Sequence, residues 1–513
     1  MVLVRARHAA AALVALLLPA GLVVGLPATA SAAAPAPVTV SLAVVGSSAR
    51  IGEDITLDVT LDSSTATGNV EIDATNPDGW AAEFGAGPLE DGRLSTKIKL
   101  GRFGTWTVVA VFAGDATHQP ATSAPVQVRI AASLGEVVVT EFRTSGPAGA
   151  EDSYVEITNT GRGSVPLDGF VLVSGSGTRT VLPSYAPYLG TGKSYLVVGK
   201  AFSLGAVATP DLTSSLGTEG FSVVAPDDVG TVTDAVGPAG RPHRGEPLPT
   251  ILGKPTAQWA FVRAQRGGRV VDTGQNLDDF ALVASEIGNV GGVWPMRGSA
   301  SPSGLRDPER SNDLVRSSLL DPTVAVSALP NRRYTAGRPA RLEIRRILTN
   351  TSTRSITRAK VRVTSLSEAD GLPYPGGTQP ALPAQLRVVN PATATTEVRF
   401  ENRPSVSVQN LTLDPPATSG GGGLNSTFTV PLPSRGLAPG ASVVVGFTFD
   451  VYVTGTFWFG YDVEALTSSG SSARLAATGR TTPRVTAGPV ERRTAVRGGS
   501  SPRATASLVR GTL

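Results

Sequence analysis

The chain has 513 residues, a net charge of +4 and no cysteine, which excludes disulfide bonds and thiolate metal sites. It contains 58 glycines and 39 prolines but only 5% aromatic residues, and no long stretch has the apolar spacing of a helix. This composition predicts an all-β protein whose short strands are joined by turns. The length remaining after a leader corresponds to roughly three domains of ordinary size.

The first 32 residues are predicted to be a secretory signal peptide. Arg5 and Arg7 precede an apolar run over residues 9–26, and small residues suited to cleavage follow up to Ala32. No later stretch approaches the roughly 18 consecutive apolar residues that cross a bilayer. The mature protein is therefore predicted to be soluble and extracellular, secreted through a Sec-type signal, with no membrane span.

Residues 34–131 are predicted to form the first domain. In residues 55–61 (ITLDVTL) the apolar side chains occupy every second position, which places one strand face in a core and the other in water. Six or seven such segments within this range match the spacing of an immunoglobulin-like sandwich. The closing segment, residues 107–128 (TVVAVFAGDATHQPATSAPVQV), resembles the last two strands of bacterial Ig-like repeats. This resemblance implies a spacer or an adhesive stalk and no particular site.

Residues 135–240 resemble a lamin tail domain, which is a compact immunoglobulin-like sandwich. Its motifs occur in order: an acidic first strand, an aromatic-x-Glu strand beginning at Tyr154, a Leu-x-Gly-aromatic strand ending near Phe170, and a Gly-rich turn before Tyr195. Tyr154 and Phe170 stand where the family commonly has Trp, which keeps an aromatic side chain in the core.

The segment 241–320 is predicted to be an irregular extension of the lamin-tail-like domain. Its Asn-x-x-Asp-Phe stretch at residues 276–280 is similar to one that often trails bacterial lamin tail domains. Residues 321–480 are predicted to form a C-terminal β-sandwich, similar to fibronectin-type domains at the level of the fold alone. Residues 481–513 lack aromatic residues and are predicted to be a disordered tail. The predicted fold class is thus all-β, with tandem immunoglobulin-like β-sandwiches.

The sequence holds no recognisable catalytic set. Two histidines, His118 and His243, remain after the signal peptide, and neither has a nearby second histidine or a spaced carboxylate to complete a zinc site. They are interpreted as exposed loop histidines. A nucleophile elbow, a phosphate-binding loop and a dinucleotide-binding motif are also absent from the sequence. The protein is therefore predicted not to be an enzyme, with no catalytic residues.

No cofactor and no metal site are predicted. Calcium is the one metal that acidic loops of such domains could hold, and the candidate pairs are Asp227-Asp228 and Asp278-Asp279. Neither pair has the spacing of an EF-hand loop, so acids in exposed turns are the preferred interpretation.

Charge is distributed unevenly along the chain. Residues 34–240 carry 11 basic and 22 acidic side chains, whereas residues 241–513 carry 32 and 19, a net of +13. This asymmetry allows an anionic partner for the second half, either a cell-wall polymer or a nucleic acid. The candidate polyanion-binding residues are Arg345, Arg346, Arg358, Lys360 and Arg362, of which the last three would share one strand face. The alternative is a solvated sheet face, since aromatic residues for stacking are not interleaved.

Three functional hypotheses follow. The first is a secreted, non-enzymatic multi-module scaffold or adhesion protein that binds a protein or a cell-envelope polymer, whose identity the sequence does not give. The second is polyanion binding through the Arg-rich C-terminal half. The third is an accessory protein of a secreted hydrolase, since lamin-tail-like domains often accompany secreted nucleases and phosphoesterases.

Overall fold

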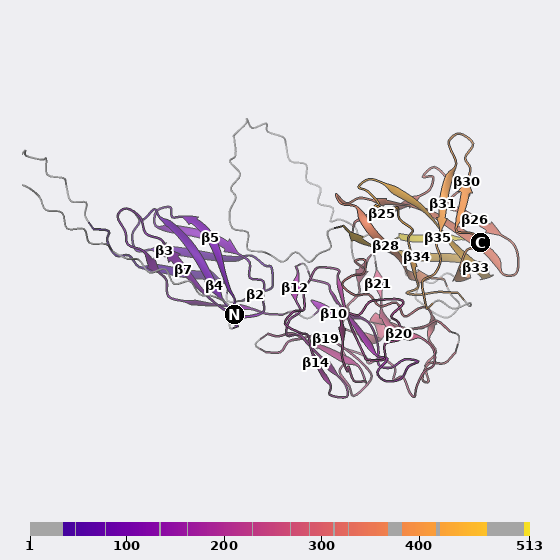
Figure 1. The fold of residues 1–513 in the computed structure, drawn as a ribbon, viewed down its shortest axis with the longest axis horizontal. Coiled ribbons are helices and arrows are strands. Elements are labelled where there is room, and N and C mark those ends of the chain that lie inside the picture. Colours follow the sequence, from indigo (N-terminus) through magenta and orange to yellow (C-terminus); the bar gives the residue numbers. More distant parts are fainter. Residues whose placement is uncertain are drawn as a thin grey trace, which may run out of the picture.

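The computed structural model is almost entirely β, with 49% of the described residues in strands and 1% in helices, which confirms the predicted fold class. In Figure 1 the strands of the N-terminal module lie to one side of the strands that follow. The described residues are 34–46, 48–76, 78–132, 135–161, 163–227, 229–266, 268–286, 288–310, 313–326, 328–367, 382–416, 421–468 and 507–512. The predicted signal peptide therefore lies outside the described residues.

The N-terminal module is a sandwich of two largely antiparallel sheets closed over an apolar interior. Alternation along β3 (Ile55–Leu61) and β7 (Gly104–Phe112) places every second side chain inside, including the fully buried Trp106. The first sheet has the order β1 (Val40–Val45), β3 (Ile55–Leu61) and β6 (Arg93–Ile98). The second has the order β2 (Ser48–Ala49), β9 (Val126–Ile130), β7 (Gly104–Phe112), β4 (Asn69–Thr75) and β5 (Ala81–Pro88), with β8 (Ala121–Thr122) beside β7.

The middle module packs a seven-stranded sheet against a four-stranded one. The larger sheet has the order β17 (Leu212–Thr213), β16 (Ser194–Val198), β11 (Tyr154–Asn159), β10 (Val137–Arg143), β20 (Trp259–Arg263), β23 (Phe280–Ala284) and β24 (Met296–Arg297). The smaller has the order β14 (Arg179–Val181), β13 (Val171–Ser174), β18 (Phe221–Val224) and β19 (Val232–Val236). Short pairs are β12 (Val165–Pro166) with β15 (Tyr188–Leu189) and β21 (Gln265–Arg266) with β22 (Arg269–Val270), and the single turn of helix is α1 (Asn276–Asp279).

The segment 241–320 is more regular than the irregular extension predicted from the sequence. Its strands β20 and β23 continue the sheet of β10, with Phe142 paired to Phe261 across the β10–β20 boundary. Phe142 also stacks on the Phe261 ring at a centroid distance of 5.3 Å. The part of this segment from β20 to β23 therefore belongs to the core of the middle module.

The C-terminal module is a third sandwich, and it has a hydrophobic core of its own. Its larger sheet has the order β25 (Val315–Leu319), β27 (Ala340–Asn350), β33 (Ser442–Val453), β31 (Val406–Asn410) and β30 (Thr395–Val398), with β26 (Arg332–Thr335) beside β27 and β29 (Gln385–Val389) beside β33. Its smaller sheet has the order β32 (Thr427–Thr429), β28 (Ile356–Leu366), β34 (Thr456–Thr467) and β35 (Ser507–Thr512).

Two features of the C-terminal module differ from prediction. Strand β25 pairs with β27, so the sandwich begins before residue 321. The disorder predicted for residues 481–513 is wrong for β35, which pairs with β34 because Val509 is buried in the core. The rest of that predicted tail, residues 481–506, lies outside the described residues. Within the part of the chain that the structure describes, no helix is long and apolar enough to cross a membrane.

Candidate functional site

The most unusual feature of the molecule is a buried cluster of charged side chains between the middle and C-terminal modules. The outer face of β10 and β11 carries Glu141 and Glu156, while Phe142 and Val155 point into the core of the middle module. The outer face of β28 and β34 carries Arg362, Asp462 and Glu464. We call the cluster the ionic joint, and its members are Glu141, Glu156, Arg310, Arg362, Asn425, Asp462 and Glu464.

Hydrogen bonds run without a break across the ionic joint. Arg310 Nη2 donates to Glu156 Oε2 (2.7 Å) and to Glu141 Oε2 (3.2 Å). Asn425 Nδ2 donates to the same Glu141 oxygen (3.0 Å), and its Oδ1 accepts from Arg362 Nη1 (2.7 Å). Arg362 in turn pairs with Glu464 of β34. The path therefore begins in the sheet of one sandwich and ends in the sheet of the next.

A segment that joins the two sandwiches, linker 299–310, completes the ionic joint. The backbone N–H groups of Ser301 and Ser303 donate to Glu141 Oε1 (2.7 Å) and Glu156 Oε2 (2.9 Å). The Ser301 carbonyl accepts from Arg362 Nη1 at 2.9 Å. Buried carboxylates are stable only when such donors compensate for lost water, so the linker is fixed by the charges that it covers.

Asp462 is the least well compensated acid of the ionic joint. With its amide oriented to satisfy its neighbours, Gln265 donates to Asp462 Oδ2 (2.8 Å) and accepts from Arg310 Nη1 (3.3 Å). The other oxygen, Oδ1, is buried without a hydrogen-bond partner. Burial, together with the negative charge of Glu464, raises the pKa of Asp462 to about 7.

The pKa values of two glutamates in the ionic joint, Glu156 and Glu464, are shifted in opposite directions. Burial raises the pKa of Glu156, and the attraction of Arg310 only partly opposes this. Burial also acts to raise the pKa of Glu464, but the adjacent Arg362 guanidinium brings it below its ordinary value. At neutral pH the ionic joint therefore holds Glu464 ionised beside an Asp462 that is close to its titration point.

The structure places the five predicted polyanion-binding residues in two locations. Arg358, Lys360 and Arg362 share the outer face of β28, and this face lies against linker 299–310: Arg358 Nη1 donates to the Arg306 carbonyl (2.8 Å) and Arg362 to that of Ser301. Lys360 and Arg362 are buried. The face is therefore neither an exposed basic stripe nor a solvated sheet face, because the neighbouring module covers it.

The other two predicted residues, Arg345 and Arg346, are buried in β27. Arg346 Nη1 donates to the Arg345 carbonyl (2.6 Å), and Arg345 Nη2 pairs with Glu343 (2.7 Å). Of the five, only Arg358 has an exposed side chain. Polyanion binding by these residues stays a prediction, and four of the five would contribute to it only through a rearrangement.

The two histidines, His118 and His243, both form hydrogen bonds within their own loops or with a neighbouring loop. His118 is buried, contrary to its interpretation as an exposed loop histidine, because its ring bonds to Ser63 Oγ (2.9 Å) and to Asp115 Oδ1 (2.9 Å). His243 is half-buried and contacts the Gly245 carbonyl (3.0 Å).

The candidate calcium ligands are used in other ways. Asp227 accepts from Thr231, Asp278 is exposed, and Asp279 pairs with Arg263 at 3.2 Å, whereas Asp228 lies outside the described residues. Among the residues whose placement is described, no group of three or more His, Cys, Asp or Glu side chains could hold a metal ion.

Sequence reasoning missed the acidic half of the ionic joint. Glu156 and Glu464 sit at alternating strand positions, where an exposed face and a covered face give the same pattern. A usable signal was the complementarity between Arg358-x-Lys360-x-Arg362 and Asp462-x-Glu464, since opposite charges on two strands favour their pairing.

Comparison with known proteins identifies one of the modules. Residues 28–131 match the family described as bacterial Ig-like domain (group 3). The lamin tail resemblance of residues 135–240 stays a prediction. No curated protein matches the chain.

Solved structures resemble the chain only weakly. One is described as a tetra-tandem repeat in the extending region of a large adhesion protein; it is 11% identical over 93% of this chain and 74% of that chain, with a TM-score of 0.23. Another, of chicken CNTN1 FN1-FN3 domains, is 11% identical over 85% of this chain and 95% of that one, with a TM-score of 0.17. At such scores the likeness carries no argument about function.

Proposed function

We propose that this protein, with a bacterial Ig-like domain at its N-terminus, is a secreted, non-enzymatic scaffold of the adhesion type. Its middle and C-terminal sandwiches would act as one rigid unit that presents binding surfaces at a fixed angle. Secretion rests on the predicted signal peptide over residues 1–32, and the middle module is proposed to be of the lamin tail type. The observation that carries the proposal is the ionic joint.

The physical argument concerns the cost of separating the two sandwiches. Parting them would break the chain of hydrogen bonds that runs from Arg310 through Glu141 and Asn425 to Arg362, and it would expose a face that folding has desolvated. Removal of one partner from a buried ion pair typically costs about 3–5 kcal/mol. Because Glu141, Glu156 and Arg362 are almost fully buried and depend on one another's partners for compensation, this joint favours a role in which fixed geometry matters.

Solution scattering tests the rigid unit. We expect the scattering curve of the full chain to fit a body in which the middle and C-terminal modules keep their arrangement. The variant Arg310→Ala should increase the spread of inter-module distances, because Glu141 and Glu156 lose their common partner. The control Arg435→Ala, at an exposed arginine that forms no ion pair within the described part of the chain, should leave the curve unchanged. Independent motion of the two modules in the unaltered protein would refute the rigid unit.

The binding role has a separate test. A crosslinking pull-down from culture filtrate and cell envelope should recover a protein or a glycan, with the isolated N-terminal module as the comparison. Recovery of nothing above that comparison would count against a scaffold role. A broad hydrolase screen of the purified chain, with and without divalent ions, should show no turnover.

A further inference from the structure

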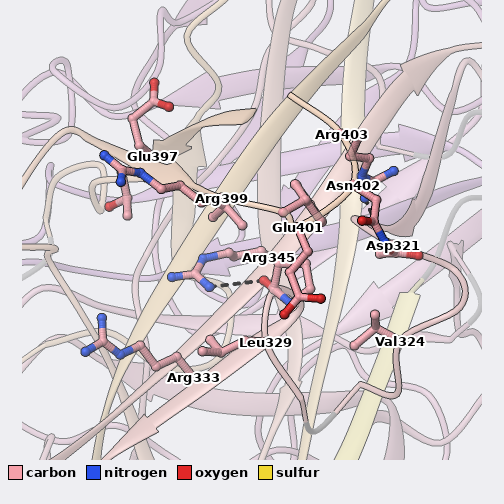
Figure 2. Close-up of a pocket in the computed structure, with 14 residues that line it drawn as sticks. Asp321, Val324, Leu329, Arg333, Arg345, Glu397, Arg399, Glu401, Asn402 and Arg403 are labelled. Carbon is pink, nitrogen blue, oxygen red and sulfur yellow. Dashed lines mark hydrogen bonds and ion pairs between the residues drawn. The ribbon is translucent and has the colours of Figure 1, made fainter. Parts of the chain in front are cut away.

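A cleft of about 590 Å³ opens at one end of the C-terminal module, away from the ionic joint residues. Figure 2 shows its lining, which comes from the loop after β25, from β26 and β27, and from β30 with the turn that follows it. This volume is in the range of sites that hold a small molecule or a few residues of peptide.

The cleft is held open by a small apolar core of its own. The β30–β31 hairpin packs Val398 and Val408 onto Leu320, outside the main core of the sandwich. Arg403 stacks over the Phe400 ring at 3.8 Å and pairs with Asp321 Oδ2 at 3.1 Å, which ties the turn of the hairpin to the opposite wall. The walls are thus fixed by contacts that do not use the remaining arginines.

Three arginines give the cleft its positive wall. In Figure 2 the guanidinium groups of Arg333, Arg345 and Arg399 point to the same side of the cleft. Arg345 is only 4% exposed, donates to the Pro330 carbonyl at 3.1 Å, and its Nε is buried without a hydrogen-bond partner. Burial lowers the pKa of Arg345, and the positive charge of Arg333 adds to this effect. Arg345 pairs with Glu343, but neither Arg333 nor Arg399 has an ion-pair partner among the described residues, so the charges of these two arginines are not balanced.

Strand β30 brings a peptide-binding feature to the same place. It is the last strand of the larger sheet and pairs only with β31 among the described strands. Consecutive residues from Thr396 to Phe400 line the cleft, although successive side chains of a strand point to opposite faces. The strand therefore turns its edge, with unpaired backbone groups, towards the cleft.

Two acids restrict the kind of anion that fits. Glu397 and Glu401 also line the cleft and have no ion-pair partner among the described residues. In Figure 2 the Glu397 carboxylate points away from Arg345. A densely charged polymer would meet these two carboxylates as well as the arginines, and like-charge contacts at an interface are costly. An isolated carboxylate on an otherwise neutral chain avoids that repulsion.

We propose that this cleft binds an extended peptide segment of a partner protein, added as a strand to the free edge of β30, with one acidic side chain paired to Arg333 and Arg399. Backbone hydrogen bonds along the edge would give affinity, and the two guanidinium groups would select the carboxylate. The inference rests on the proposed binding role and names the chemistry of its partner.

Fluorescence anisotropy on the full chain tests this with defined probes. The first is an end-blocked, labelled peptide of sequence Ser-Val-Glu-Val-Thr-Ser; the second replaces Glu by Gln, and the third is N-methylated on alternate residues. We expect the Gln and N-methylated probes to bind roughly tenfold or more weakly, since each loses charge-assisted or strand hydrogen bonds. Arg333→Gln and Arg399→Gln should each weaken the first probe by a similar factor. Arg435→Gln is the matched control and should not weaken binding of the first probe. Unchanged melting temperatures will show that the variants fold.

Each other outcome overturns the proposal. If the Glu and Gln probes bind equally well, the cleft does not select a carboxylate. If the N-methylated probe binds as well as the first probe, the peptide is not added as a strand to β30. Tighter binding of heparin or polyglutamate, with the same dependence on Arg333, makes the cleft a polyanion site. If no probe binds, the cleft is not a site of this kind, while the rigid unit, which scattering tests independently, is unaffected.

Discussion

Asp462 gives the ionic joint a pH dependence whose sign follows from its raised pKa. An unfolded aspartate titrates near pH 3.9, whereas Asp462 titrates at about 7 in the folded protein. Between these values the folded state holds more protons than the unfolded state, so the free energy of unfolding falls as the pH rises from about 4 to about 7. Glu156, whose pKa is also raised, adds to this effect.

Replacement of Asp462 by Asn should therefore stabilise the protein at alkaline pH. Asn keeps an oxygen for Gln265 but carries no charge to desolvate. At pH 8 we expect the free energy of unfolding to rise by roughly 1–3 kcal/mol, since each unit of pKa shift corresponds to about 1.4 kcal/mol. Denaturant titration between pH 4 and 8 measures this. A wild type whose stability does not decline across that range would contradict the raised pKa.

Glu464 has the opposite effect on the free energy of unfolding, and it acts at lower pH. Its pKa is lowered beside Arg362, so its contribution is complete above the ordinary glutamate pKa and is lost as the pH falls through the folded value. The two acids together predict a stability maximum in the mildly acidic range.

Arg362 and Arg358 provide a matched comparison of a buried and an exposed arginine on one strand face. Arg362→Met leaves Glu464 buried without its ion pair and should cost about 3–5 kcal/mol. Arg358→Met removes the contacts of an exposed side chain with Asp307 and with the Arg306 carbonyl, and about 0–1 kcal/mol is usual for an exposed ion pair. Thermal and denaturant unfolding of the two variants give the comparison. Equal losses would show that Arg362 is not part of a desolvated network.

At the scale of elements, β35 shows how a polar-looking segment gains order. Its neighbours in the sequence are rich in Arg, Ser and Gly, yet Val509 is 2% exposed and the strand covers the edge of β34 from Thr456 to Tyr461. Composition averages over a long window and so hides a six-residue strand. The edge of β34 supplies the backbone partners that such a strand needs, and only the fold brings the two together.

Truncation after residue 506 should therefore destabilise the C-terminal module. Loss of β35 exposes the edge of β34 and the apolar surface under Val509, so we expect a lower melting temperature and self-association through the free edge. Val509→Asp should produce the same loss of stability without shortening the chain. Differential scanning calorimetry and size-exclusion chromatography measure the two effects. A truncated protein with unchanged melting temperature would show that β35 contributes nothing to the fold.

Strands β10 and β11 illustrate the limit of pattern reading. The sequence correctly predicts strands at these positions, and the apolar face formed by Phe142 and Val155 does point into the core. All residues of both strands are nevertheless buried. The second face is covered by linker 299–310 and by Asn425, which is 284 residues away from its partner Glu141. A contact between residues so far apart in the chain produces no pattern in the neighbouring sequence from which it could be predicted.

At the scale of the whole molecule, the two junctions between modules differ in kind. The N-terminal module meets the middle one through Phe103 against Phe170, at a ring distance of 5.7 Å, and through the partly exposed pair Arg102–Asp168 at 2.6 Å. The second junction is the ionic joint, with its buried and mutually dependent bonds. The first junction should therefore separate before the second.

Calorimetry of the full chain should show two transitions. One belongs to the N-terminal module and the other to the middle and C-terminal modules unfolding together. Arg102→Ala should alter the first transition only slightly, because a single, partly solvent-exposed ion pair contributes little. Arg310→Ala should split the second transition in two. A single transition for the unaltered chain would instead mean that all three modules unfold as one.

The sequence by itself determined the β class, the strand over residues 55–61 and the resemblance of the first module to bacterial Ig-like repeats, because strand alternation and turn residues are local properties. It also placed Arg358, Lys360 and Arg362 on one face. Only the tertiary structure decided what that face meets. Burial of a charged side chain depends on which distant strands supply its partners, so the same alternating pattern serves a solvated surface and the ionic joint equally well.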